Sequence, residues 1–145
     1  MNQEIKENLN QLALSRTTAF CYGCYMDAKG GVCARCGSDD LMRKLPGVGV
    51  EYGTDWVITH ILETELSPID SNELFEEHIR GCYPETTQVG FMIVDTAHAM
   101  KSLDPIAWNL ARDEYIDSLE SDEEIVSLDH GATYYRMSDI LHLIE

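Results

Sequence analysis

Four of the five cysteines form two C-x-x-C pairs separated by eight residues: Cys21, Cys24, Cys33 and Cys36. Each C-x-x-C turn can bring two sulfur atoms to one ion, and the intervening YMDAKGGV segment can close the second pair onto the first. Four thiolates fill the tetrahedral coordination of Zn²⁺ and leave no position for a reactive water. We therefore expect one structural zinc ion in this segment and no catalytic metal.

Three other interpretations of the cysteine cluster are a redox dithiol pair, an iron site of four cysteines and unconnected free thiols. The loop between the pairs lacks the additional apolar shell that would protect a redox-active iron. The N-terminal segment MNQEIKENLNQLAL has neither a basic leader nor a secretory cleavage site, which favours a cytoplasmic location where cysteines stay reduced. In that compartment paired C-x-x-C motifs favour a metal over disulfides.

The segments CYGC and CARCGSDDLMR resemble the paired knuckles of zinc-ribbon proteins, in which the second knuckle often reads C-x-x-C-G and continues into a strand. The resemblance covers residues 20–43 of the 145 and implies a metal ion and a small ribbon. Zinc ribbons serve as binding or bracing modules in transcription, replication, translation and many enzymes. The resemblance therefore does not select a function.

Two further pairs of residues have spacings that could do chemistry. Cys82 lies four residues after His78, but Gly81 argues against an intact helix there, so we expect a buried apolar Cys82 rather than a second metal site. Asp95 and His98 follow an apolar segment, where α/β enzymes often keep catalytic groups. Because no nucleophile, Gly-rich phosphate loop or H-x-x-x-H motif accompanies them, we expect a surface turn and no enzymatic activity.

The net charge of −16 is concentrated in one part of the chain. Residues 1–48 carry six basic and five acidic residues, a net charge of +1, whereas residues 49–145 carry four basic and 21 acidic residues, a net charge of −17. A field of that sign repels nucleic-acid phosphates and attracts basic protein surfaces. Solubility alone would also explain such an excess of acid.

The charge distribution leads to our first functional hypothesis, a non-enzymatic protein that docks an acidic surface on a basic partner. The partner would itself handle nucleic acid, as for the small acidic inhibitors of restriction or CRISPR machinery encoded by phages and plasmids. The acidic residues expected to contact it belong to one predicted helix and the segment after it: Asp113, Glu114, Asp117, Glu120, Asp122, Glu123 and Glu124. Neither direct nucleic-acid binding by this domain nor membrane binding is expected.

An alternative hypothesis is a zinc-ribbon protein that binds nucleic acid or is associated with transcription, with the acid serving solubility. Lys29, Arg35, Arg43 and Lys44 lie near the knuckles, and Tyr22 and Tyr25 could stack on bases. A third hypothesis, an enzyme using Asp95 and His98, would need a concave pocket that the sequence does not indicate.

The elements that must hold these residues follow from periodicity and turn signals. Ile5, Leu9 and Leu12 predict an amphipathic helix over residues 3–14. The glycines and proline of LPGVGVEYG, together with the change in charge, predict a boundary near residues 46–54. We therefore expect an N-terminal helix and zinc-ribbon module over residues 1–48 and an acidic α+β domain over residues 49–145.

The acidic domain is expected to contain four helices and a small sheet. Thr54 or Asp55, Asp70, Asp104 and Ser138 are the expected N-caps, and Pro105 suits the first position of the third helix. The apolar run Gln88–Val94 predicts a buried strand. Residues 124–137 predict two short antiparallel strands joined around Asp129, His130 and Gly131. The fold class is therefore α+β, with a sheet that is at least partly antiparallel.

Overall fold

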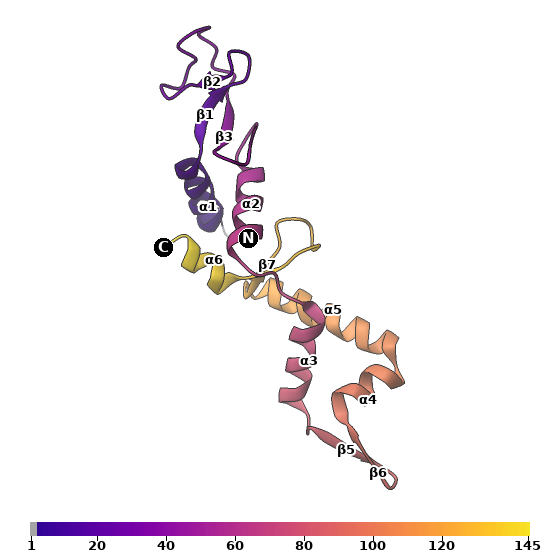
Figure 1. The fold of residues 1–145 in the computed structure, drawn as a ribbon. Helices are drawn as coiled ribbons and strands as arrows, with labels where there is room; N and C mark the ends of the chain where they lie inside the picture. Colours follow the sequence, from indigo (N-terminus) through magenta and orange to yellow (C-terminus); the bar gives the residue numbers. More distant parts are fainter. Residues whose placement is uncertain (1–2) are drawn as a thin grey trace. The chain divides into compact units, whose positions relative to one another are not determined.

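The computed structural model describes residues 3–145, which form six α-helices and three small antiparallel sheets and so confirm the α+β class (Figure 1). None of the helices in this range is both long and apolar enough to cross a membrane. The helices are α1 (Gln3–Arg16), α2 (Asp55–Glu65), α3 (Ser71–Cys82), α4 (Thr96–Leu103), α5 (Pro105–Ser121) and α6 (Met137–Leu143). The strands are β1 (Thr18–Cys21), β2 (Met26–Asp27), β3 (Met42–Leu45), β4 (Gly49–Glu51), β5 (Thr86–Val89), β6 (Met92–Asp95), β7 (Ile125–Val126) and β8 (Tyr135–Arg136).

The chain divides into two compact units. An N-terminal unit comprises Met1–Ser67 and Ser138–Glu145, and an acidic unit comprises Pro68–Met137. The boundary expected between residues 48 and 49 instead falls inside the β3–β4 hairpin, where Leu45 pairs with Gly49. The compact units differ from the expected domains because α2 packs on α1 and the end of the chain returns to the same core.

The N-terminal unit combines a four-stranded ribbon with a helical core. The strands lie in the order β2-β1-β3-β4, and all their pairings are antiparallel. Helices α1 and α2 lie side by side (Figure 1), and Ala13, Val57 and Ile61 form their buried contact. Partly buried Leu143 of α6 packs against the same cluster. The predicted N-terminal helix is confirmed, with Ile5 and Leu9 buried.

Arg43 of β3 joins the ribbon to the end of α1. Its guanidinium donates to the hydroxyl of Thr17 (2.9 Å), the carbonyl of Thr17 (2.9 Å) and the carbonyl of Leu14 (3.2 Å). The last carbonyls of a helix lack partners within the helix and carry partial negative charge, so a cation there is favourable. These hydrogen bonds of Arg43 therefore fix the ribbon to α1 close to the segment that carries the four cysteines.

The acidic unit has a core formed by three helices. Phe75 and Ile79 of α3, Ala97 of α4 and Trp108 of α5 are buried together, and Tyr115 packs against them. The predicted caps of α3 and α5 are confirmed, because carboxylate oxygens accept from backbone N–H groups one turn later. Asp70 accepts from Asn72 and Glu73, and Asp104 accepts from Ala107.

The predicted N-cap position of α2 is confirmed at Thr54 without the expected capping bond, and the predicted cap of α6 is wrong. Thr54 occupies the N-cap position of α2, but its side chain makes no capping hydrogen bond. Its hydroxyl instead donates to the side-chain oxygen of Asn10 on α1, so Thr54 links α1 to α2 rather than capping α2. Ser138 lies inside α6, which begins at Met137.

The predicted buried strand Gln88–Val94 is also wrong. Gly90, with φ +64°, is the first of two turn residues between β5 and β6, as a type II′ hairpin turn requires. The apolar run is thus an exposed two-stranded hairpin rather than one buried strand. The hairpin predicted over residues 124–137 is confirmed, because β7 pairs antiparallel with β8.

Candidate functional site

The ribbon brings the sulfur atoms of the four predicted metal ligands together. The ligand atoms of Cys21, Cys24, Cys33 and Cys36 all lie within 4.8 Å of one another, and the Sγ atoms of Cys21 and Cys36 are 3.7 Å apart. Four sulfurs at about 2.3 Å from a tetrahedral ion would be roughly 3.8 Å apart. The cysteine set therefore fits a single metal ion.

Each cysteine pair turns back on itself through a residue with left-handed backbone. Gly37 follows the second pair with φ +73°, as expected for a knuckle, and Tyr25 follows the first pair with φ +54°. The backbone N–H of Gly37 donates to the carbonyl of Cys33 (2.8 Å), and the N–H of Cys33 donates to the carbonyl of Ser38 (2.8 Å). A left-handed tyrosine is uncommon, so the first turn is held in place by the surrounding ribbon.

The clustered thiols differ in acidity when no cation balances their charge. Backbone N–H groups of Cys36 and Arg35 donate to the sulfur of Cys33 and lower its pKa to about 6. The neighbouring Cys36 thiol and burial raise the pKa of Cys24 to about 12. The N–H of Cys24 lowers the pKa of Cys21, but burial and the other thiols outweigh it and raise that pKa. A divalent cation would stabilise all four as thiolates.

The metal assignment rests on this geometry and on the cysteine spacing. No protein-family model, curated protein or solved structure matches the chain.

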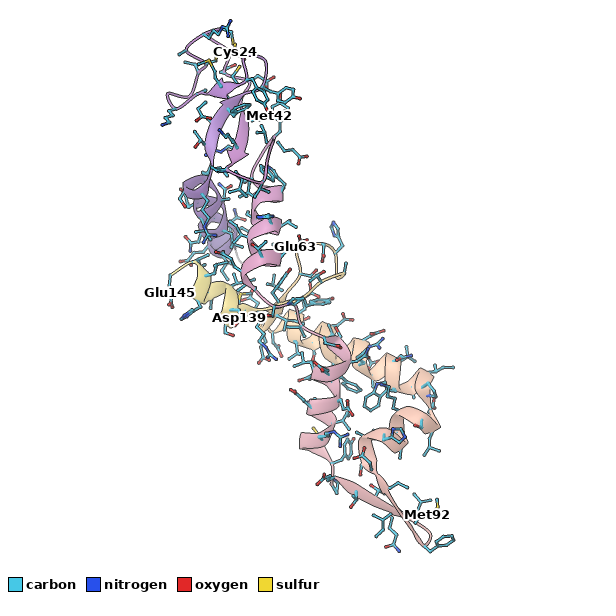
Figure 2. The ribbon with its side chains drawn as sticks, in the orientation of Figure 1. Cys24, Met42, Glu63, Met92, Asp139 and Glu145 are labelled. Carbon is cyan, nitrogen blue, oxygen red and sulfur yellow. The ribbon has the colours of Figure 1, made fainter. Side chains whose placement is uncertain are left out.

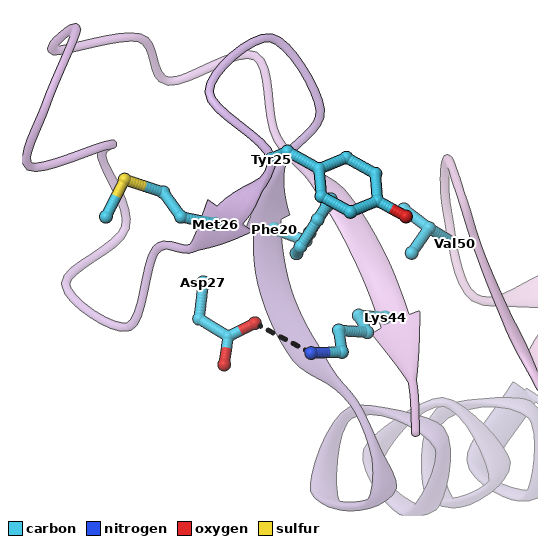
Figure 3. Close-up of a pocket in the computed structure, with 6 residues that line it drawn as sticks. All are labelled: Phe20, Tyr25, Met26, Asp27, Lys44 and Val50. Atoms are coloured by element: carbon cyan, nitrogen blue, oxygen red, sulfur yellow. Dashed lines mark hydrogen bonds and ion pairs between the residues drawn. The ribbon is translucent and has the colours of Figure 1, made fainter. Parts of the chain in front are cut away.

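A small pocket lies on the ribbon beside the cysteine segment (Figure 3). It has a volume of about 310 Å³ and is lined by Phe20, Tyr25, Met26, Asp27, Lys44 and Val50. The ammonium of Lys44 lies 3.3 Å from a carboxylate oxygen of Asp27 and 5.5 Å from the ring centre of Phe20. Tyr25 packs edge-on against Phe20 and is largely exposed. The pocket thus offers aromatic surface with one charge of each sign.

Two of the four basic residues predicted to be available near the knuckles are already engaged. Arg43 bonds the end of α1, and Lys44 pairs with Asp27. Lys29 and Arg35 are exposed. The positive surface of the ribbon is therefore smaller than its sequence indicates.

The seven acidic residues predicted to contact a partner are all exposed, on α5 and in the segment that follows it. Burial raises the pKa of Tyr134, and the negative charges of Glu120, Asp117 and Asp113 raise it further. The hydroxyl of Tyr134 donates to a carboxylate oxygen of Glu120 at 3.4 Å. Arg112, the basic residue next to Asp113 on α5, forms an ion pair with the Asp113 carboxylate at 3.1 Å.

His78 and Cys82 face each other on α3, because this helix continues through Gly81 to Cys82. The expectation that Gly81 interrupts the helix is therefore wrong. The sulfur lies 3.8 Å from Nε2 of His78, and both residues are exposed, which corrects the expectation of a buried Cys82. The imidazole stacks on the ring of Tyr115 with centres 4.0 Å apart. This pair supplies two ligand atoms and has no third His, Cys, Asp or Glu ligand among the described residues.

Asp95 and His98 serve the structure at the start of α4. Asp95 is the N-cap of this helix and accepts from the backbone N–H of His98 at 2.9 Å. Its two carboxylate oxygens also accept from Arg80 of α3, at 2.9 and 3.2 Å. Arg80 and the His98 N–H hold the pKa of Asp95 below its usual range. The Asp95 carboxylate is thus committed to a cap and an ion pair.

Sequence analysis missed the apolar surface of the β5–β6 hairpin. Val89, Phe91, Met92 and Ile93 are all exposed, and Phe91 is the most exposed large apolar side chain among the described residues. The available signal was Gly90 in the middle of an apolar run, since an isolated glycine in a strand pattern often marks a turn or a bulge.

Proposed function

We propose that the protein is a non-enzymatic binding protein, braced by one zinc ion, whose acidic unit docks on the basic surface of a partner protein. The partner is a protein that handles nucleic acid, and the carboxylates of the acidic unit occupy its phosphate-binding surface. Such a protein would inhibit or regulate its partner.

Zinc is the proposed metal because four cysteines in a closed cluster are typical of structural zinc sites. The four thiolates would occupy every coordination position, so the metal would brace the ribbon and would not activate water. Iron held by the same ligands would give a coloured, redox-active protein. A purified protein that is colourless and contains one zinc per chain therefore supports zinc over iron.

The proposal rests on three exposed carboxylates of α5, Asp113, Asp117 and Glu120, which we call the acidic row. The acidic unit holds fifteen acidic and four basic residues, a net charge of −11. Asp113, Asp117 and Glu120 follow one another at spacings of four and three residues on α5, which places them on one face of the helix, and all three are exposed. An excess of negative charge on one unit is self-repelling, and a basic partner would relieve that repulsion.

The spacing of the row supports a partner that binds nucleic acid. Residues four and three apart on a helix are separated by about 6 and 4.5 Å along its axis. Each strand of duplex DNA presents one phosphate for roughly every 3.4 Å of axis. The row as a whole spans about 10.5 Å, close to three phosphate steps, so a groove of lysines and arginines suited to phosphates could contact both of its ends.

The test is a pull-down from nuclease-treated lysate with zinc-loaded protein as bait and a salt gradient for elution. We expect a basic nucleic-acid-handling protein to elute at moderate salt. Neutralising the row by Asp113→Asn, Asp117→Asn and Glu120→Gln should weaken its retention at least tenfold. The matched control Glu7→Gln, Glu51→Gln and Glu63→Gln changes the net charge equally at exposed positions outside the acidic unit and should retain the partner.

A second candidate function is nucleic-acid binding by the ribbon, which the pocket of Figure 3 favours. The exposed ring of Tyr25 could stack on a base, and the ammonium of Lys44 could exchange Asp27 for a phosphate. In that case the protein would shift a labelled single-stranded probe, and Tyr25→Ala would abolish the shift. Retention of nucleic acid before nuclease treatment, with no protein retained afterwards, would favour this candidate over protein binding.

A further inference from the structure

The β5–β6 hairpin presents apolar side chains that the described chain does not cover. Its sheet has two strands, with Val89 paired to Met92 on either side of the turn. Phe91 is 94% exposed and Ile93 is 74% exposed, while about half of Val89 and of Met92 is exposed. We call these four side chains the apolar tip; Figure 2 marks Met92 near the turn. Because successive residues of a strand point to opposite faces, these side chains occupy both faces of the hairpin. Exposed apolar patches mark interaction sites in soluble proteins.

The base of the hairpin is fixed to the helices of the acidic unit. The Arg80 guanidinium holds Asp95 at the end of β6, and the N–H of Thr96 donates to the carbonyl of Glu85 at 3.0 Å. The hydroxyls of Thr87 and Thr96 are hydrogen-bonded at 2.6 Å. An isolated two-stranded hairpin is only marginally stable in water, so these bonds hold the strands in place. A held hairpin has less conformational entropy to lose when it docks.

All of the hairpin except Asp95 at its end is uncharged, although it belongs to a strongly acidic unit. Residues 86–94 contain no charged residue, whereas the unit as a whole has a net charge of −11. This uncharged segment includes the run Gln88–Val94, whose composition predicts a buried strand. In protein interfaces, apolar or aromatic anchors supply affinity, and charged residues of the same surface supply steering.

We propose that the apolar tip inserts into an apolar groove of a partner protein whose rim carries lysine and arginine. The proposal rests on the proposed function and adds the anchor that the acidic row lacks. The charge selects this occupant, because a second copy would bring two units of −11 together. Anionic lipid would be repelled for the same reason.

Defined peptides test the proposal without knowledge of the partner. The probes are a fluorescent peptide that alternates lysine and leucine, a glutamate–leucine peptide of equal length and an oligolysine of equal length. By fluorescence anisotropy, the lysine–leucine peptide should bind the zinc-loaded full chain more tightly than oligolysine, and the glutamate–leucine peptide should not bind. The double variant Phe91→Ser, Ile93→Thr should weaken lysine–leucine binding at least fivefold and leave oligolysine binding unchanged.

A matched control removes equally exposed apolar side chains elsewhere in the unit. Leu103 and Ile106 are 81% and 74% exposed, and the variant Leu103→Ser, Ile106→Thr should keep lysine–leucine binding. Phe91→Ser alone, at a turn position outside the strand pairing, should show most of the loss with an unchanged circular dichroism spectrum.

Three outcomes would overturn the tip assignment: equal loss in the control variant, a dimer in sedimentation that the tip variant dissociates, or tip-dependent binding to phosphatidylcholine vesicles. Failure of oligolysine to bind would instead contradict the acidic docking surface, since that probe tests charge alone. The two proposals can thus fail separately.

Discussion

Arg80 of α3 and Asp95 at the end of β6 form a two-pronged ion pair, with Nη1 2.9 Å from Oδ1 and Nη2 3.2 Å from Oδ2. The same arginine reaches Glu76, one turn earlier on its own helix, at 3.0 Å. Asp95 also caps α4 through the N–H of His98. One pair of side chains therefore joins α3, the hairpin and α4.

Replacement of Arg80 by methionine should destabilise the acidic unit. The two side chains are 41% and 37% exposed, so solvent screens the pair, and we expect only a small loss in the free energy of unfolding. Urea unfolding followed by circular dichroism measures it. Lys101→Met removes a charge from an exposed position of α4 and should change stability by less. Equal losses in both variants would show that the ion pair contributes nothing specific.

The Asp95→Asn variant isolates the charge of this residue, since asparagine also caps helices. Because the folded pKa of Asp95 lies below its usual range, the carboxylate stabilises the fold at pH values above the unfolded pKa of about 3.9. That contribution is lost as the pH falls through the folded pKa. The stability difference between wild type and Asp95→Asn should thus be constant from pH 7 to 5 and shrink near pH 3. Urea midpoints at these three pH values test the prediction, which a constant difference at all three would contradict.

Loss of one cysteine ligand should abolish the metal site. Cys33→Ser is expected to lose zinc and to unfold residues 18–45, because a segment this short has little other core. Zinc stoichiometry and amide hydrogen exchange over these residues measure the two effects. Cys82→Ser changes an exposed cysteine outside the cluster and should keep one zinc per chain. Full stoichiometry and thermal stability in Cys33→Ser would refute the structural role.

Two glycine-to-alanine substitutions should have opposite effects on the acidic unit. Gly131 has φ +91°, and an added Cβ would lie 3.1 Å from the hydroxyl of Tyr134, so alanine should cost about 1–3 kcal/mol. Gly81 lies inside α3 with open space around it, so alanine should raise helix stability by up to about 1 kcal/mol. Urea unfolding of both variants checks the signs. Destabilisation by Gly81→Ala would contradict a helix that continues through this residue.

The sequence by itself determined the elements whose signals are local. The C-x-x-C spacing identified the four cysteines that the ribbon brings together, because the turn within each pair brings its two sulfur atoms close whatever the rest of the chain does. Asp70, Asp104 and Pro105 located α3 and α5 for the same reason, since a cap and its backbone partners lie within one turn.

The tertiary structure alone decided which segments share a core and which apolar residues stay exposed. The return of α6 to the core formed by α1 and α2 depends on packing between residues far apart in the chain, which no local pattern encodes. The run Gln88–Val94 has the composition of a buried strand, yet burial also requires a covering element, and the described chain supplies none. Gly81 likewise stays helical because Ile79 packs into the core, and tertiary packing outweighs the weak helix propensity of glycine.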